Sequence, residues 1–340
     1  MASARASAND NPGIEPGARA LRVSGGRECL HLVGAGPESQ GDENMSKKHP
    51  IVAVTGSSGA GTTTVKRAFE HIFFRDGINA AVIEGDSFHR YDRAEMKVEM
   101  ANAAEEQRNL SHFGPEANRF DLLEELFRSY GETGGGKKRY YIHSEEEAAH
   151  HNARLGTQLN PGQFTPWEDV PENTDLLFYE GLHGLVVTEE DNVARHVDLG
   201  VGVVPIVNLE WIQKIHRDNL ERGYSAEAIV DTIMRRMPDY IRHITPQFSL
   251  TDINFQRVST VDTSNPFIAR DIPTPDESFV IIRFKDPEKL EIDFPYLLSM
   301  VHDSFMSRRN SMVVPGGKMG MAMEIILQPI IERMMAGRRV

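Results

Sequence analysis

Short apolar runs alternating with helical patterns organise most of this chain. The β-branched run at residues 51–55 (IVAVT) predicts a buried strand, and a Gly-rich turn follows it. A helical pattern then covers about residues 63–75, and the apolar run at residues 80–83 predicts the next strand. This strand–turn–helix–strand order is typical of a βαβ unit, which joins parallel strands of one sheet.

The pattern continues with elements of both kinds and shows no internal repeat. Apolar runs at residues 176–179 and 199–207 predict buried strands, residues 250–285 are strand-like, and residues 131–173 are polar and Gly-rich. Helical patterns cover residues 92–108, 117–130, 209–222, 226–243 and 319–334. We therefore expect an α/β fold with a mixed, mostly parallel central sheet flanked by helices.

The first 44 residues differ from the rest. They are rich in Gly, Ala, Ser and Pro and lack apolar periodicity, so we expect a disordered N-terminal extension over residues 1–44 and one domain over residues 45–340. Four Arg and two acidic residues among the first 27 positions would suit a transit peptide. The six acidic residues of the whole segment make a poor amphipathic helix, which favours Met45 as the natural start.

Composition excludes several classes of function. The 340 residues are 40% hydrophobic, enough for a sizeable core, and no apolar run reaches the length of a membrane span. A net charge of −13 is a poor match for general nucleic-acid binding, so an anion would need a local basic cluster. Cys29 is the one cysteine, which excludes an intrachain disulfide and fits a reducing, cytoplasmic location.

The turn after the first strand has the pattern of a phosphate-binding P-loop. Its glycines let backbone N–H groups point at phosphate oxygens, and the following helix adds a favourable dipole. Thr63 supplies a hydroxyl for Mg²⁺, but Thr62 replaces the usual Lys, so another cation must reach the β- and γ-phosphates. A Gly-rich β-turn is the alternative. The residues expected to bind ATP are Gly56, Ser57, Ser58, Gly59, Ala60, Gly61, Thr62, Thr63 and Thr64.

Two acidic residues follow predicted strands. Asp86 comes after the strand at residues 80–83, and ligands of open parallel sheets bind beyond such ends. A carboxylate there can accept the proton of an attacking hydroxyl, although Asp86 could instead cap the next helix. Glu180 ends the strand at residues 176–179, the Walker-B position, where an acid helps to hold Mg²⁺; the alternative is an exposed strand-terminal acid.

One predicted helix gathers charged residues that could act on phosphate. Lys214, Arg217, Asp218 and Arg222 fall within an arc of about 140°, so three cations and one acid share a face. Lys214 or Arg217 is the candidate to replace the absent P-loop Lys. The alternative is a solvated charged face with i,i+4 pairing, such as Lys214 with Asp218.

A second basic group follows Asp86. His89, Arg93 and Lys97 recur at four-residue intervals, so on a helix they would form one basic stripe. Arg offers bidentate contacts to phosphate, and the stripe would therefore suit an acceptor that already carries a phosphate. A solvated helix face is again the alternative.

Together these residues resemble phosphoribulokinase, within the uridine kinase-like group of P-loop kinases. Beyond the P-loop, the resemblance rests on residues 83–90 (IEGDSFHR), 208–218 (NLEWIQKIHRD) and 262–267 (DTSNPF), and it extends from about Lys47 to the C-terminus. It implies ATP-dependent phosphorylation of ribulose 5-phosphate at C1, giving ribulose 1,5-bisphosphate, a reaction of the Calvin cycle.

The resemblance also implies residue roles. Asp86 would take the proton from the C1 hydroxyl, and Asp218 and Glu180 would serve the metal and the phosphoryl centre. Lys214 and Arg217 would stabilise the transferring phosphoryl group, because its transition state spreads charge over equatorial oxygens. The residues that would face ribulose 5-phosphate are His89, Arg93, Lys97 and Arg222.

Regulation and assembly are implied in the same way. Bacterial members look like homo-oligomers, specifically octamers, stimulated by NADH, and Arg75, Arg283 and Arg308 match positions tied to that effector. The chain lacks the cysteine pair of the plant type, so no thiol–disulfide switch is expected.

Two other functions stay open. A nucleoside kinase of the same superfamily would share the P-loop and Asp86, but it would not need a cationic stripe, because uridine carries no phosphate. A regulatory nucleotide-binding module would show the P-loop without needing an acid beside that stripe. Turnover with a sugar phosphate separates the three.

Overall fold

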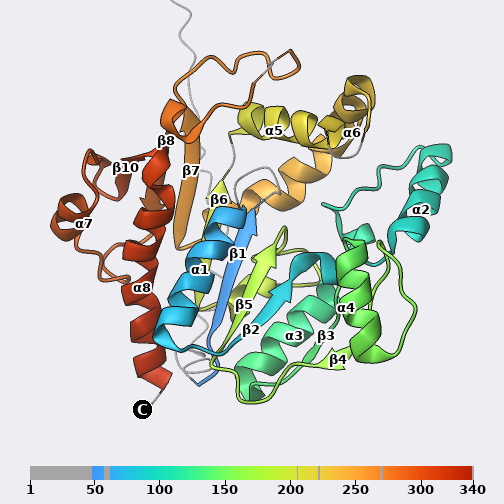
Figure 1. The fold of residues 1–340 in the computed structure, drawn as a ribbon, viewed down its shortest axis with the longest axis horizontal. Coiled ribbons are helices and arrows are strands. Elements are labelled where there is room, and N and C mark those ends of the chain that lie inside the picture. Colours follow the sequence, from blue (N-terminus) through green and yellow to red (C-terminus); the bar gives the residue numbers. More distant parts are fainter. Residues whose placement is uncertain (1–47, 57–61, 205, 221–222, 269–270, 339–340) are drawn as a thin grey trace, which may run out of the picture. The chain divides into compact units, whose positions relative to one another are not determined.

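An eight-stranded sheet forms the centre of the unit Asn44–Val340 (Figure 1). The computed structural model describes residues 48–56, 62–204, 206–220, 223–268 and 271–338. Five neighbouring strands run parallel, in the order β2 (Ala80–Glu84), β5 (Leu176–Gly181), β1 (Ile51–Gly56), β6 (Leu199–Val204) and β7 (Ile253–Ser259). The sheet continues antiparallel through β8 (Ser278–Phe284), β10 (Ser311–Pro315) and β9 (Phe305–Arg308). The expected mixed, mostly parallel sheet is confirmed.

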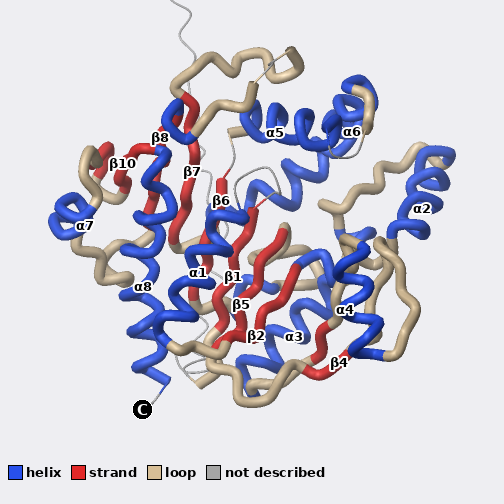
Figure 2. The backbone as a smooth tube through the Cα atoms, in the orientation of Figure 1, coloured by secondary structure: helices blue, strands red, loops and turns tan. Residues whose placement is uncertain are grey.

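Helices cover this sheet (Figure 2). Their bounds are α1 (Thr62–Asp76), α2 (Arg93–Glu105), α3 (Phe120–Thr133), α4 (Glu145–Leu155), α5 (Val207–Leu220), α6 (Ala226–Asp239), α7 (Phe294–Met300) and α8 (Met319–Arg338). A small two-stranded sheet pairs β3 (Lys137–Lys138) with β4 (Glu168–Asp169). No helix in these ranges is both long and apolar enough to cross a membrane.

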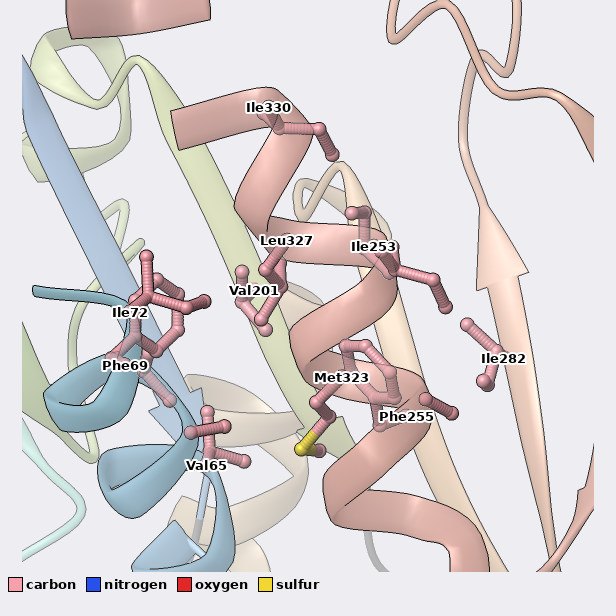
Figure 3. Packing of buried hydrophobic residues seen from close by; sticks show 14 of the residues in the cluster. Val65, Phe69, Ile72, Val201, Ile253, Phe255, Ile282, Met323, Leu327 and Ile330 are labelled. Carbon is pink, nitrogen blue, oxygen red and sulfur yellow. The ribbon is translucent and has the colours of Figure 1, made fainter. Parts of the chain in front are cut away.

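Alternating side chains of β1 supply two separate hydrophobic clusters, because successive residues of a strand face opposite sides. Val52 and Val54 join the cluster under α1 and α8, which also contains Phe69 of α1, Leu327 of α8 and neighbours from the sheet (Figure 3). Ile51 and Ala53 join the cluster under α3 on the opposite face. The sheet is therefore buried on both sides, as expected for parallel strands between helices.

The structure adds two details to the predicted pattern. First, β1 and β2 of the βαβ unit are parallel strands of one sheet, as expected, and β5 lies between them. Second, the polar, Gly-rich residues 131–173 contain α4, β3 and β4. Ser144 caps the start of α4 by accepting a hydrogen bond from the Glu147 N–H, and Gly156 ends it at φ +68°. Its apolar face is small, with Ala148 as its buried residue, so the hydrophobic pattern gave little signal.

Candidate active site

The parallel strands bring the predicted site residues to one edge of the sheet. β1 ends at Gly56, Asp86 follows β2, and Glu180 is the last residue but one of β5, where it pairs in register with Glu84. Ligands of such sheets bind beyond the carboxyl ends of the strands. The strand and the helix that flank the P-loop are confirmed. Residues 57–61 and the side chains of Thr62 and Thr63 lie outside the described part of the chain.

Two glycines allow β2 and β5 to approach closely at this edge. A methyl group added to Gly85 would stand 2.9 Å from the Gly181 Cα, and one added to Gly181 would stand 2.7 Å from the Gly85 Cα. Atoms of a real side chain are essentially never so close, so both positions need glycine. This approach sets the separation between the turn that carries Asp86 and the strand end that carries Glu180.

Asp86 lies in the short 3-10 helix Gly85–Phe88 with its side chain 42% exposed. Its two carboxylate oxygens lie 3.7 Å from Nε2 of His89 and 3.8 Å from Nε2 of His143. The alternative role as a helix cap is wrong, because Asp92 caps α2 by accepting hydrogen bonds from two backbone N–H groups. The Asp86 carboxylate is therefore partly open to an incoming hydroxyl.

Behind Asp86 lies a group of buried histidines. The rings of His89 and His112 are 4.6 Å apart, and Nε2 of His183 donates to the backbone carbonyl of His112 at 3.0 Å. Burial lowers the pKa of all three, that of His183 to about 3. These rings are neutral at physiological pH, and His89 meets Asp86 as a neutral group.

The predicted basic stripe of His89, Arg93 and Lys97 is only partly present. His89 precedes α2 and has extended backbone (φ −60°, ψ 145°), so it does not share a helix face with the other two. Arg93 and Lys97 lie one turn apart on α2, and both are exposed. The stripe fails because the capping box of Asp92 makes Arg93 the first residue of the helix, so His89 lies before it.

The charged cluster of α5 is present and largely buried. Lys214 donates to Asp218, and Arg217 donates to the same carboxylate from Nε at 3.1 Å and from Nη2 at 3.0 Å. The Asp218 side chain is only 5% exposed, so the pairing does not sit on a solvated face. Burial would raise the pKa of Asp218, but the two cations outweigh it and lower that pKa. Arg222 lies outside the described residues.

A lysine that the sequence analysis did not single out lies at the strand ends. Lys66 of α1 places Nζ 3.1 Å from Oε1 of Glu84, and its ammonium also feels the charge of Glu180. Burial would lower the pKa of Lys66, but these carboxylates raise it overall. A charged helix position two residues after the last P-loop residue, Thr64, gave no signal, because the partner carboxylates lie on other strands.

Arg139 and His143 were also missed. Both come from the segment between β3 and α4, and both contact the Asp86 turn. Nothing in local spacing links this segment to residues some 50 positions earlier.

The predicted effector arginines fall into two places. Arg283 of β8 and Arg308 of β9 are both exposed and both pair in register with Ser311 of β10, so they lie on the two strands that flank β10. Arg75 lies in the last turn of α1, with Nε 3.2 Å from Oδ1 of Asp76.

The carboxylates at the edge of the sheet could hold Mg²⁺ together with substrate phosphates. No three His, Cys, Asp or Glu side chains gather into a metal site within the described ranges. Mg²⁺ in kinases is usually held by one or two carboxylates together with substrate phosphates, so such a cage is not required. Glu180, partly exposed at the phosphate-side edge of the sheet, fits this requirement.

Comparison with known proteins agrees with this geometry. Residues 51–264 match the Phosphoribulokinase / Uridine kinase family. A plasmid-encoded phosphoribulokinase of Cupriavidus necator is 63% identical over 296 residues, which cover 87% of this chain and 99% of the relative. The phosphoribulokinase of Nitrobacter vulgaris is 59% identical over 288 residues, covering 84% of this chain and 97% of its own.

A solved structure extends the likeness to the fold. The phosphoribulokinase from Rhodobacter spheroides superposes with a TM-score of 0.78 at 55% sequence identity, covering 87% of this chain and 100% of its own. Sequence and fold agree over nearly the whole length of each relative, and the chain belongs to the phosphoribulokinase and uridine kinase family.

Proposed function

We propose that this chain transfers the γ-phosphoryl group of ATP to the C1 hydroxyl of ribulose 5-phosphate, giving ribulose 1,5-bisphosphate. The observation that carries this proposal is the 63% identity with a protein named phosphoribulokinase over almost that protein's full length. The partly open carboxylate of Asp86, at the same sheet edge as the P-loop strand, supports it independently.

Asp86 is the proposed base. Its carboxylate would accept the proton of the C1 hydroxyl as that oxygen attacks the γ-phosphorus. His89 and His143 approach the two carboxylate oxygens and would fix their direction. Because His89 is neutral when buried, it orients Asp86 without neutralising it.

The α5 cluster is the proposed electrostatic centre. Lys214 and Arg217 would stabilise charge on the transferring phosphoryl group, and one of them would replace the missing P-loop Lys. Asp218 holds both cations in place, and a direct metal contact from it stays a prediction. Glu180, with Thr63, would hold Mg²⁺, which neutralises phosphate charge when bound.

Exposed cations of α2 would bind the acceptor. Arg93 and Lys97 on α2, together with Arg222, are proposed to hold the 5-phosphate of the sugar. His89 would then contact the sugar rather than its phosphate, because it lies apart from the helix face.

The finer properties implied by the resemblance belong to the same proposal. The enzyme would act in the cytoplasm as a homo-oligomer, an octamer by resemblance, with NADH as an activator. Arg308→Ala should then weaken stimulation by NADH and leave the basal rate nearly unchanged. Equal rates of the wild-type enzyme with and without NADH would remove this regulatory claim alone.

The acceptor panel tests the proposed function. ADP formation is measured in a coupled assay with Mg²⁺ and ribulose 5-phosphate, ribose 5-phosphate, uridine or no acceptor. We expect fast turnover only with ribulose 5-phosphate, because C1 of ribose 5-phosphate is an aldehyde carbon and not a primary alcohol. A comparable rate with uridine would favour a nucleoside kinase, and ATP binding without turnover would favour a regulatory module.

A further inference from the structure

We propose that Arg139 is a positioning residue that holds the Asp86 turn in its reactive geometry. The inference rests on the proposed function, because it concerns the base of that reaction. None of the roles proposed above requires the contacts that the Arg139 side chain makes.

The Arg139 guanidinium binds the backbone on both sides of Phe88. Its Nε donates to the Ser87 carbonyl at 2.8 Å, and its Nη2 donates to the His89 carbonyl at 2.7 Å. These are the first and third residues after Asp86, so one rigid fork fixes the chain immediately beyond the carboxylate. A lysine could not span both carbonyls with the same geometry.

Aromatic rings fix the plane of this fork. The guanidinium carbon lies 3.6 Å from the centroid of the Phe164 ring and 4.6 Å from that of Trp167. The Trp167 ring in turn packs edge-to-face against Phe88 at 5.7 Å. Cation–π contacts of this kind orient a guanidinium as well as attract it, so the direction of both hydrogen bonds is set.

The charged guanidinium of Arg139 is partly buried, which costs free energy. Burial lowers its pKa to about 10, yet no carboxylate lies within ion-pair distance of it in the described part of the chain. Burying a cation costs free energy, and the two hydrogen bonds to the Ser87 and His89 carbonyls offset part of that cost. Its placement is explained by the turn that it holds.

The segment that carries Arg139 also supplies a histidine that approaches Asp86. The same segment carries Tyr141, whose ring packs against Phe164 at 5.3 Å and against His143 at 5.0 Å. His143 then reaches to 3.8 Å from Asp86. Loss of Arg139 should therefore release the carboxylate and one of its histidine partners together.

The kinetic consequence is specific to the acceptor side. A misplacement of about 1 Å in a reacting group can cost on the order of 100-fold in rate. We expect Arg139→Ala and Arg139→Lys to lower kcat about 10- to 100-fold and to raise the KM for ribulose 5-phosphate. The KM for ATP should stay within about twofold, because the P-loop strand lies two strands away.

The experiment combines steady-state kinetics, chemical rescue and backbone exchange. Arg154→Ala is the matched control, because Arg154 also lies over an aromatic ring in this region but pairs with Glu168 and does not touch the Asp86 turn. Guanidinium at concentrations well below those that unfold the protein should restore part of the kcat of Arg139→Ala and none in Asp86→Asn. A role confined to folding would give no such rescue.

Hydrogen exchange measured by mass spectrometry tests the inference without turnover. Amides of residues 84–92 should exchange faster in Arg139→Lys than in wild type, and those of residues 176–181 should not change. Unchanged exchange at residues 84–92 would overturn the proposal, as would a kcat within twofold of wild type in both variants. A wild type that does not phosphorylate ribulose 5-phosphate would refute the proposed function, whereas the exchange result would still decide the role of Arg139. If Arg139→Ala fails to fold, the exchange and kinetics of Arg139→Lys decide it.

Discussion

Asp86 shows how far local sequence signals reach at the residue scale. Its place just after a predicted strand identified it as a candidate base, and the structure excludes the competing role of helix cap because Asp92 fills it. The structure adds two features that the sequence did not show, namely the approach of two histidines to its carboxylate and a side chain that stays partly exposed.

Replacement of Asp86 by Asn should remove most of the rate while leaving ATP binding intact. A positioned general base contributes on the order of 10²- to 10⁴-fold, and Asn keeps the size without accepting the proton. Steady-state kinetics with ribulose 5-phosphate measure the effect, with Asp169→Asn, an exposed acid on β4, as the control. A kcat within about tenfold of wild type would show that Asp86 is not the base.

Residues that approach Asp86 from distant segments could not be predicted. Asp86 and Glu180 follow apolar runs and so carry a local signal, whereas Arg139, His143 and Lys66 act through partners on other elements. The stripe of His89, Arg93 and Lys97 failed for a related reason: equal spacing implies one face only if the helix has already begun.

At the scale of elements, the ends of β2 and β5 determine the geometry of the site. The backbones of Gly85 and Gly181 approach each other closely, and this contact fixes how closely the Asp86 turn approaches the end of β5. The order of the strands could not be read from the sequence, because insertion of β5 between β1 and β2 depends on long-range pairing.

The Gly85→Ala substitution should therefore destabilise the protein by about 1–3 kcal/mol, the usual range for an overpacked site, and lower activity as well. Its methyl group would press on the backbone of Gly181, which cannot rotate away. Urea unfolding measures the effect against Gly337→Ala, where nothing lies within 4 Å of the added methyl group. Equal stability of the two variants would contradict the close approach.

The loop after β5 gives the protein a pH dependence. His183 has a folded pKa of about 3, below its usual value of about 6.5, because burial disfavours its charged form. Above pH 6.5 neither state binds a proton there. As the pH falls below about 6.5, His183 binds a proton in the unfolded chain but not in the folded chain. The free energy of unfolding therefore decreases by up to about 1.4 kcal/mol per pH unit.

Urea unfolding of His183→Gln between pH 5 and pH 8 tests this dependence. The variant should lose less stability than wild type on acidification, although it is less stable at pH 8, where it lacks the ring packed on Phe120. His71→Gln, on the exposed surface of α1, is the control for the loss of a histidine that is not buried. Parallel curves for His183→Gln and wild type would refute a neutral buried His183.

At the scale of the whole molecule, the sheet and its two helical layers followed from hydrophobic periodicity. Runs such as residues 51–55 are buried on both faces, and that is why they stand out in the sequence. The helix α4, within the polar stretch at residues 131–173, could not be predicted because its small apolar face leaves little periodic signal. The same stretch supplies Arg139 and His143, so the part of the chain that was hardest to predict contributes to the site.

Removal of residues 1–44 should leave the melting temperature and kcat unchanged. The solved relative matches 87% of this chain over 100% of its own length, so its fold is complete without a counterpart to the remainder. Their composition also gives these residues no apolar pattern with which to join a core. Calorimetry and kinetics on a variant that begins at Met45 measure this, and a melting temperature lower by several degrees would show that the segment contributes to stability.

The identity of the product tests the central claim most directly. The enzyme is incubated with ATP, Mg²⁺ and ribulose 5-phosphate, and phosphorus NMR follows the products. We expect one equivalent of ADP and a new phosphate monoester coupled to the C1 methylene protons, that is, ribulose 1,5-bisphosphate. Formation of inorganic phosphate without a second sugar phosphate, or phosphorylation at a position other than C1, would contradict it.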